Sequence, residues 1–269
     1  MQSLSPIARR KPKPRPVVLS IAGYDPSSGA GITADIKTIA AHACYGITCI
    51  TSLTVQSARG VKRVEAVEGR VITETLEELI ADLEIAAIRI GMLGSAEAAR
   101  GVAAFLKRYL HRHVVLDPIL KSSSGAELLS KEGLQILKDR LLGMVLVVTP
   151  NIDEAATLTG LRVSNLDEMG AAALRLRQAG ARNVIITGGH LDPPADLISI
   201  ESSKRFVVLT GKKIVSRSTH GTGCAFSTAL ACNLALGQNL VDAAKAAKRY
   251  VELALRNAPV LSRGVGPVV

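Results

Sequence analysis

The stretch from Ser218 to Cys224 has the residue types of a phosphate-binding loop. It consists of Ser-Thr-His-Gly-Thr-Gly-Cys and runs into the small-residue segment 225–231, which predicts a helix. Glycines on both sides of Thr222 let the backbone turn tightly and aim successive N–H groups one way, and the following helix adds the positive end of its dipole. We therefore expect an anion site that stabilises the negative charge of a phosphoryl group during its transfer. The alternative is an ordinary glycine-containing loop before a buried helix.

Cys224 falls in the first turn of that predicted helix. At helix N-termini the pKa of a thiol drops from about 8.5 to roughly 3.5–7.5. This position predicts a thiolate that acts as a base or nucleophile. The alternative is that Cys224 is a small apolar filler.

A second glycine-rich loop follows the first predicted strand. Val17 to Ala22 is a continuous apolar run, typical of a buried strand, and it is followed by the loop 23–31 and a predicted helix over 33–43. The loop matches neither the P-loop nor the dinucleotide-binding pattern. Loops at the carboxyl ends of strands are nevertheless where open α/β sheets bind ligands.

Two polar side chains near this loop could contact a ligand. Asp35 lies in the first turns of the predicted helix, and the alternative for it is an exposed charge pair with Lys37. Gln56 follows a second predicted strand over 46–54, and its amide is suited to reading the edge of a heteroaromatic ring, although it could equally be an ordinary loop residue. The alternating segment 61–67 predicts an extended surface stretch, which could form a flap over the site.

The remaining pattern alternates strands with helices, which predicts a three-layer αβα sandwich with a mainly parallel sheet. The further predicted strands are 86–92, 114–117, 144–149 and 183–187, the helices are 96–110, 131–142, 152–158, 165–178, 222–236 and 240–257, and a late hairpin spans 205–209 and 212–215.

Acidic and amide side chains follow the later strands. Asp117 ends one strand, and Asn151 and Glu154 come just after another. The carboxyl ends of parallel strands share one edge, so we expect these side chains to lie together with Gln56. Asp117 and Glu154 have hard oxygen ligands suited to a Mg²⁺ that carries nucleotide phosphates. Taken alone, Glu154 could instead be an acid that complements a helix dipole.

Composition narrows the function classes. The chain has 269 residues, 48% of them hydrophobic and only 3% aromatic, which predicts one domain over 17–269 and argues against base stacking with nucleic acid. Five of the 33 basic residues and none of the 23 acidic residues lie in the proline-rich segment 1–16, so the net charge of +10 falls to +5 without it. We interpret 1–16 as a disordered, solubilising tail.

The cysteines and histidines favour a cytoplasmic protein without zinc. The four cysteines show no Cys-x-x-Cys spacing, the five histidines include no His-Glu-x-x-His pair, and no signal peptide or membrane-spanning run is evident. We therefore expect reduced thiols, a small-molecule substrate, and no nucleic-acid or membrane partner.

Several motifs together resemble the hydroxymethylpyrimidine and hydroxymethylpyrimidine phosphate kinases of thiamine biosynthesis, in the ribokinase-like superfamily. They occur in order, with compatible spacing, from about Val17 to the C-terminus. The motifs are the segments 22–31, 34–38, 55–56, 90–93, 116–118, 149–151 with 154–155, 188–191, 219–224 and 264–268.

The resemblance implies a kinase that uses ATP and Mg²⁺ to phosphorylate 4-amino-5-hydroxymethyl-2-methylpyrimidine and then its monophosphate. It also implies a homodimer. The implied site has an anion hole and base at Gly221, Thr222, Gly223 and Cys224, a pyrimidine pocket at Gln56, Gly23, Asp35, Met92 and Ile119, an ATP side at Asn151, Glu154 and Thr187, and metal ligands at Asp117 and Glu154.

The chain departs from the family pattern at three positions. Thr187 and Ser123 stand where many relatives have lysine, although Lys121 lies close to the second position, and Tyr24 stands where serine or threonine is usual. The missing lysines predict weaker ATP binding or a weaker second phosphorylation. Pyridoxal kinase activity is the nearest alternative, and a sugar or nucleoside kinase, a thiol hydrolase and a catalytically weak ligand-binding relative are further ones.

Overall fold

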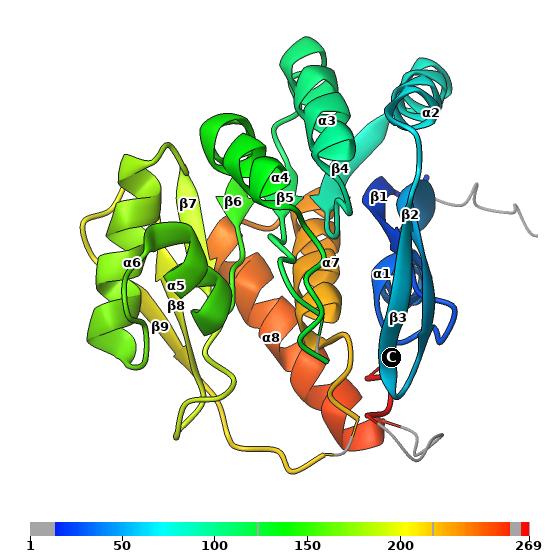
Figure 1. Cartoon of the computed structure of the whole chain (residues 1–269). Helices are drawn as coiled ribbons and strands as arrows, with labels where there is room; N and C mark the ends of the chain where they lie inside the picture. Colours follow the sequence, from blue (N-terminus) through cyan, green and yellow to red (C-terminus); the bar gives the residue numbers. More distant parts are fainter. Residues whose placement is uncertain (1–13, 123, 217, 259–264, 269) are drawn as a thin grey trace, which may run out of the picture.

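One nine-stranded sheet organises the chain. In this computed structural model, which describes residues 14–122, 124–216, 218–258 and 265–268, the strand order is β3-β2-β1-β4-β5-β6-β7-β8-β9 (Figure 1). The strands are β1 (Val17–Tyr24), β2 (Tyr45–Ser57), β3 (Gly60–Ala66), β4 (Ile85–Ile90), β5 (Val114–Leu116), β6 (Val147–Val148), β7 (Asn183–Ile186), β8 (Ala195–Ser199) and β9 (Val207–Thr210). The six strands from β2 to β7 in this order run parallel, whereas β3 pairs antiparallel with β2, β8 with β7 and β9 with β8.

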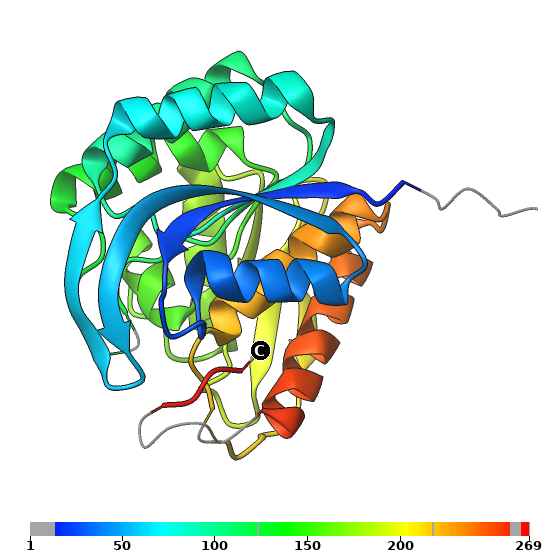
Figure 2. The ribbon, with the colours of Figure 1, turned by 90° about the vertical axis from the view of Figure 1, so that its right-hand side faces the viewer.

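Helices cover both faces of the sheet, which confirms the predicted αβα sandwich. The helices are α1 (Gly31–Ala41), α2 (Gly69–Asp82), α3 (Ala96–Arg108), α4 (Lys131–Ile136), α5 (Ile152–Thr159), α6 (Leu166–Gln178), α7 (Thr222–Ala235) and α8 (Leu240–Asn257). Figures 1 and 2 show α1, α7 and α8 on one face and α2 to α6 on the other.

Alternation along the strands builds a separate core on each face. In β1, Leu19 and Ile21 pack with the core under α2 to α6, whereas Val18 packs with the core under α1, α7 and α8. Side chains also mark several helix starts, since Ser95, Asn165 and Asn239 each accept a hydrogen bond from the N3 backbone N–H of α3, α6 and α8.

Three local expectations are wrong. The predicted late hairpin pairs the wrong segments, because β9 pairs with β8 and the segment 212–215 forms no strand. Helix α2 was not expected from the sequence at all. The predicted helix over 131–142 ends early, as α4 gives way to the π-helix η1 (Leu137–Leu141) and the 3₁₀-helix η2 (Leu142–Met144).

The segment predicted as a flap is the edge strand β3, which pairs antiparallel with β2. In Figure 2 this hairpin curves past the end of the sheet, close to the chain's last residues. Val265 N–H donates to the Ala58 carbonyl oxygen in the hairpin turn at 3.2 Å. Among the described residues, no helix has the length and apolar character to cross a membrane.

Candidate active site

The predicted site residues form a row along the carboxyl edge of the parallel strands. Because β2, β1, β4, β5, β6 and β7 are neighbours in this order, the residues at or just after their ends follow the same order. The row is Gln56, Gly23, Met92, Asp117, Asn151 and Thr187. The residues predicted to bind the pyrimidine thus occupy one end, those predicted to bind ATP the other, and Asp117 lies between.

The loop before α7 has the backbone geometry of an anion site. Gly221 caps α7 with a φ of 85°, and a Cβ there would overlap the carbonyl oxygen of Gly29, so this position requires glycine. A Cβ at Gly223 would meet no atom within 4 Å, which leaves open space in front of the loop. The N–H groups of the first turn of α7 have no acceptor within the helix. Thr222 N–H donates to the Thr219 carbonyl oxygen at 3.4 Å, and the N–H groups after it can bind an anion.

A network of Asp25, His220 and Gln56 joins this loop to the two strands beside it. Asp25 accepts hydrogen bonds from the N–H groups of Ser27 at 2.8 Å and Ala30 at 2.9 Å, which hold the loop after β1. His220 Nε2 lies 2.9 Å from Asp25 Oδ2 and 3.1 Å from Gln56 Nε2. Burial raises the pKa of Asp25, but the hydrogen bonds from His220 and Ser27 outweigh it and hold this pKa below its ordinary value. Sequence reasoning assigned Asp25 no role.

Gly23 and Met92 lie against each other at the predicted pyrimidine end. A Cβ at Gly23 would lie 2.9 Å from Ser52 Oγ and 3.0 Å from Met92 Sδ, so a larger residue would displace both side chains. Thr51 Oγ1 donates to the Met92 carbonyl oxygen at 2.6 Å and fixes the chain there. Ile119, predicted as a pocket wall, is half-buried in the loop after β5.

Cys224 does not have the lowered pKa expected at a helix N-terminus. Its side chain is buried, and this burial raises the pKa of the thiol to about 12 although the nearby Arg89 guanidinium acts in the opposite direction. At neutral pH the thiol therefore keeps its proton.

Asp35 is fully buried, so its interpretation as an exposed charge pair with Lys37 is wrong. Its carboxylate accepts hydrogen bonds from Ser20 at 2.5 Å, Thr228 at 2.8 Å and Arg89 at 2.9 Å, while Lys37 donates to the backbone of the loop after β1. The predicted contact between Asp35 and the pyrimidine stays a prediction. In this structure the carboxylate accepts hydrogen bonds from other protein side chains.

Arg89 is the main site residue that sequence reasoning missed. It lies in β4, is fully buried, and pairs with Asp35 and with Asp117, whose Oδ2 is 2.7 Å from Arg89 Nη2. Burial opposes the charge of Arg89, but the acids around it raise its pKa, so it stays charged. One signal was available, because Arg89 is the only charged residue in an otherwise apolar strand.

Asn151 and Glu154 close the start of α5. Asn151 Oδ1 accepts from Glu154 N–H at 2.8 Å, and Glu154 Oε2 accepts from Asn151 N–H at 2.9 Å, which forms a capping box. Glu154 therefore has the helix-start role that was the alternative for it. Its carboxyl also lies close enough to Asp117 for the two acids to repel each other.

The two acids Asp117 and Glu154 fit a divalent cation. Burial and then repulsion from Asp117 raise the pKa of Glu154 to about 8, and burial likewise raises the pKa of Asp117. A cation beside them would favour the charged forms that burial disfavours. No cluster of three or more His, Cys, Asp or Glu side chains occurs in the described part of the chain, so a metal here would take its other ligands from phosphates and water, as Mg²⁺ usually does.

Thr187, at the ATP end, is half-buried and donates its N–H to the Pro150 carbonyl oxygen at 2.9 Å. This bond holds the end of β7 beside the start of α5. Ser123, the other departure from the family pattern, lies outside the described residues. Lys121 is exposed in the same loop.

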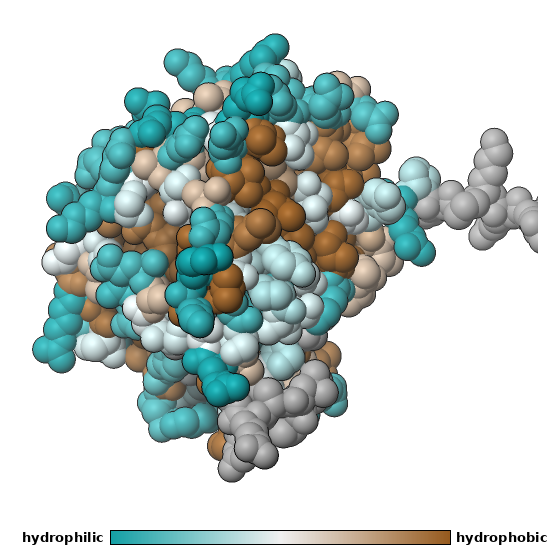
Figure 3. All heavy atoms as spheres, turned by 45° about the vertical axis from the view of Figure 1, so that its right-hand side comes forward, coloured by the Kyte–Doolittle hydropathy of each residue, from teal (hydrophilic) through white to brown (hydrophobic). Residues whose placement is uncertain are grey.

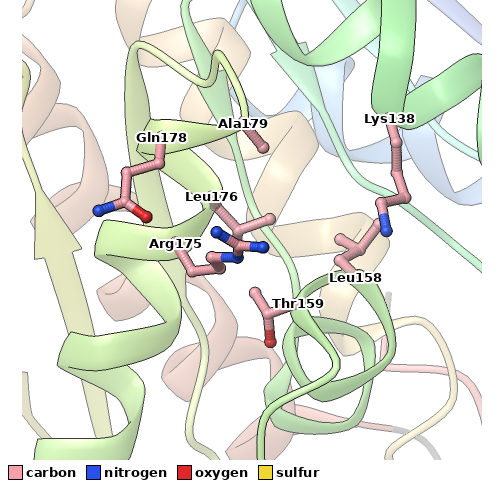
Figure 4. A pocket seen from close by; sticks show the side chains of 7 residues that line it. All are labelled: Lys138, Leu158, Thr159, Arg175, Leu176, Gln178 and Ala179. Carbon is pink, nitrogen blue, oxygen red and sulfur yellow. The ribbon is translucent and has the colours of Figure 1, made fainter.

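A cavity of about 280 Å³ lies away from this row of residues (Figure 4). It lies where α5 and α6 end and η1 passes, and none of the predicted site residues lines it. The lining residues are Lys138, Leu158, Thr159, Arg175, Leu176, Gln178 and Ala179. The candidate site is therefore a row of loops along the sheet edge, distinct from this cavity.

Comparisons with known proteins agree with this geometry. A family model described as phosphomethylpyrimidine kinase matches residues 25–269. The thiamine biosynthesis bifunctional protein ThiED of Geobacter sulfurreducens is 41% identical over 97% of this chain, which spans 53% of that protein, or about half its length. The hydroxymethylpyrimidine/phosphomethylpyrimidine kinase of Aquifex aeolicus is 36% identical over 92% of this chain and 97% of its own length.

A solved structure shows the same fold. The pyridoxal kinase from Staphylococcus aureus in complex with AMP-PCP and pyridoxal superposes with a TM-score of 0.84 and 30% identity, over 94% of this chain and 92% of that chain. The match of the family model to nearly the whole chain, together with the Aquifex relative, decides the assignment: the chain belongs to the phosphomethylpyrimidine kinase family.

Proposed function

We propose that the protein transfers the γ-phosphoryl group of ATP to the hydroxymethyl oxygen of 4-amino-5-hydroxymethyl-2-methylpyrimidine, and then phosphorylates the monophosphate to the diphosphate. The observation that carries this proposal is the position of the glycine-rich loop at Gly221–Gly223, which leads directly into the N-terminus of α7. That helix packs under β4 and β5, between the two ends of the row of site residues. The names of the curated relatives support the same substrate.

Each half of the site has a separate task in this reaction. The N–H groups of the loop before α7 stabilise the negative charge of the transferring phosphoryl group. Gln56, held by His220, faces the pyrimidine ring, and Gly23 and Met92 shape the pocket beside it. Asp117 and Glu154 would hold Mg²⁺, which neutralises phosphate charge when it is bound.

Cys224 orients the acceptor hydroxyl rather than removing its proton in advance. A thiol with a pKa of about 12 is protonated at neutral pH and cannot act as a preformed base. Phosphoryl transfer through a loose transition state requires little early deprotonation of the acceptor, so an orienting hydrogen bond is sufficient.

The test is ATP-dependent phosphorylation of the pyrimidine with Mg²⁺, with the mono- and diphosphate products measured separately. Cys224→Ala should lower kcat and leave ATP affinity unchanged. A loss of roughly 100-fold or more would indicate proton transfer by the thiol, whereas a smaller loss fits orientation alone. Wild-type turnover of the variant would remove Cys224 from the mechanism and leave the anion loop in place.

Pyridoxal is a second candidate substrate. The specific observation in its favour is the likeness to the Staphylococcus aureus enzyme, whose structure holds pyridoxal and an ATP analogue. Parallel kcat/KM measurements on the pyrimidine and on pyridoxal separate the two. A higher value for pyridoxal would assign the protein to vitamin B6 salvage.

A cytoplasmic homodimer is the state that we propose for the enzyme. The four free thiols support a reducing compartment. Leu53 and Val55, on β2, are 48% and 45% exposed, and Figure 3 shows apolar residues among hydrophilic ones on one face of the molecule. The double variant Leu53→Lys/Val55→Lys should sediment as a monomer if these two exposed side chains pack against a second subunit.

A further inference from the structure

Arg89 has the largest of the fully buried side chains in the described part of the protein. Its guanidinium donates from Nη1 to Asp35 Oδ2 at 2.9 Å, from Nη2 to Asp117 Oδ2 at 2.7 Å and from Nε to Ser227 Oγ at 3.1 Å. It also lies close enough to the Cys224 thiol for each group to act on the pKa of the other. One side chain of β4 therefore hydrogen-bonds to residues of α1, the loop after β5 and α7.

These contacts determine which oxygen of Asp117 can reach a ligand. Asp117 Oδ2 accepts both the bond from Arg89 and a bond from Ser227 Oγ at 3.0 Å. The other oxygen, Oδ1, is left for the site. Arginine suits this task because its planar fork holds two carboxylates in a fixed geometry, whereas a lysine ammonium is a point charge on a flexible stem.

The chain leaves room for this side chain at Gly91. Arg89 folds back over the backbone two residues further on, and a Cβ at Gly91 would lie 2.6 Å from Arg89 Cζ and 2.9 Å from Nη2. The guanidinium cannot move aside without breaking these contacts, because it is fully buried and hydrogen-bonded to three side chains. The glycine in the segment 90–93 is therefore explained by the guanidinium that lies against it.

We propose that Arg89 is a positioning residue for phosphoryl transfer, which holds Asp117 with Oδ1 toward the nucleotide and holds the start of α7 beside it. This inference rests on the proposed kinase function. Arg89 does not touch substrate, since it has no exposed surface. It acts through Asp117 on the metal–phosphate side. On the acceptor side it acts through Ser227, whose hydroxyl lies 3.2 Å from the Cys224 carbonyl oxygen.

The experiment compares Arg89→Lys and Gly91→Ala with the wild type and with a control, Leu137→Ala. The first variant keeps a positive charge but loses the fork, and the second keeps arginine but displaces its guanidinium. Leu137 is buried in the core on the opposite face of the sheet, so its variant is destabilised without touching the network. The readouts are kcat, the KM for the pyrimidine, the affinity for ADP with Mg²⁺ by calorimetry, and the Tm.

Both test variants should lose about 10–100-fold in kcat and in ADP affinity, as is typical when a residue behind a metal ligand is changed. The KM for the pyrimidine should change much less than kcat, because Ser20 and Thr228 still hold Asp35. Leu137→Ala should lower the Tm at wild-type kcat. Wild-type kcat and ADP affinity in both Arg89→Lys and Gly91→Ala, with a lowered Tm, would overturn the proposal and leave Arg89 a structural residue.

The same design separates this inference from the proposed function. If the wild type phosphorylates neither the pyrimidine nor pyridoxal, the proposed function fails. The ADP affinities of Arg89→Lys and Gly91→Ala still decide the role of Arg89, because they require no acceptor substrate.

Discussion

Raising the pH should destabilise the nucleotide-free protein through Glu154. The folded state holds the pKa of this carboxyl at about 8, against an ordinary value of 4.5. Between these values the unfolded chain has released the proton and the folded chain still binds it, so the free energy of unfolding falls as pH rises. Below 4.5 both states are protonated and the effect vanishes, and above about 8 it is complete.

The magnitude follows from the two pKa values. A difference of about 3.5 in pKa corresponds to roughly 5 kcal/mol as an upper limit, at 1.36 kcal/mol for each pKa unit. Because Asp117 is among the causes of the raised pKa, the two acids share this penalty. Mg²⁺ with a nucleotide should relieve it, since a cation favours both carboxylates in their charged form.

The assay is urea unfolding at pH 5, 7 and 9 without metal, for the wild type and Glu154→Gln. The glutamine keeps an oxygen that can accept the Asn151 N–H, so the capping box can persist. We expect the free energy of unfolding of the variant, relative to that of the wild type, to rise by several kcal/mol between pH 5 and pH 9. Asp153→Asn, an exposed acid in the same turn, is the control and should show no comparable gain. A constant difference between wild type and Glu154→Gln at all three pH values would refute the reasoning.

Three further predictions concern the loops and the ATP end. Gly221→Ala should lower the free energy of unfolding in urea by at least about 1–2 kcal/mol, because the backbone at this position is left-handed and a Cβ would overlap the Gly29 carbonyl oxygen. Gly223→Ala, where a Cβ meets no atom within 4 Å, should fold normally and bind ATP less tightly. Thr187→Lys should lower the KM for ATP by about tenfold if it adds one charged hydrogen bond to phosphate, and an unchanged KM would mean that the side chain does not reach the nucleotide. Asp25→Asn should lower the free energy of unfolding at pH 6. This loss relative to the wild type should shrink as pH falls below 3.8, because the lowered pKa of Asp25 stabilises the fold only while the carboxyl is charged. A loss of the same size under acid would contradict this.

Helices and strands with a clear local sequence pattern were predicted correctly. Elements that depend on contacts between residues far apart in the chain were missed. Helix α2 has no side-chain cap at its start, so it lacks the usual start signal, and its Ile72 and Leu76 are ordered by packing against the sheet. The strand β8 contains Asp196, which interrupts an apolar run. Its charge is paired with Lys248 of α8, 52 residues away, at 2.7 Å, and no local pattern reveals that contact.

The sequence by itself determined the alternation that makes an αβα sandwich, the glycines of the loop before α7, and the gathering of polar residues at one sheet edge. These features depend on residue type and on spacing along the chain. Only the tertiary structure decided that Cys224 is buried with a raised pKa, that Asp35 faces Arg89, and that His220 joins Asp25 to Gln56. These properties depend on desolvation and on partners brought together by folding, which spacing along the chain does not record.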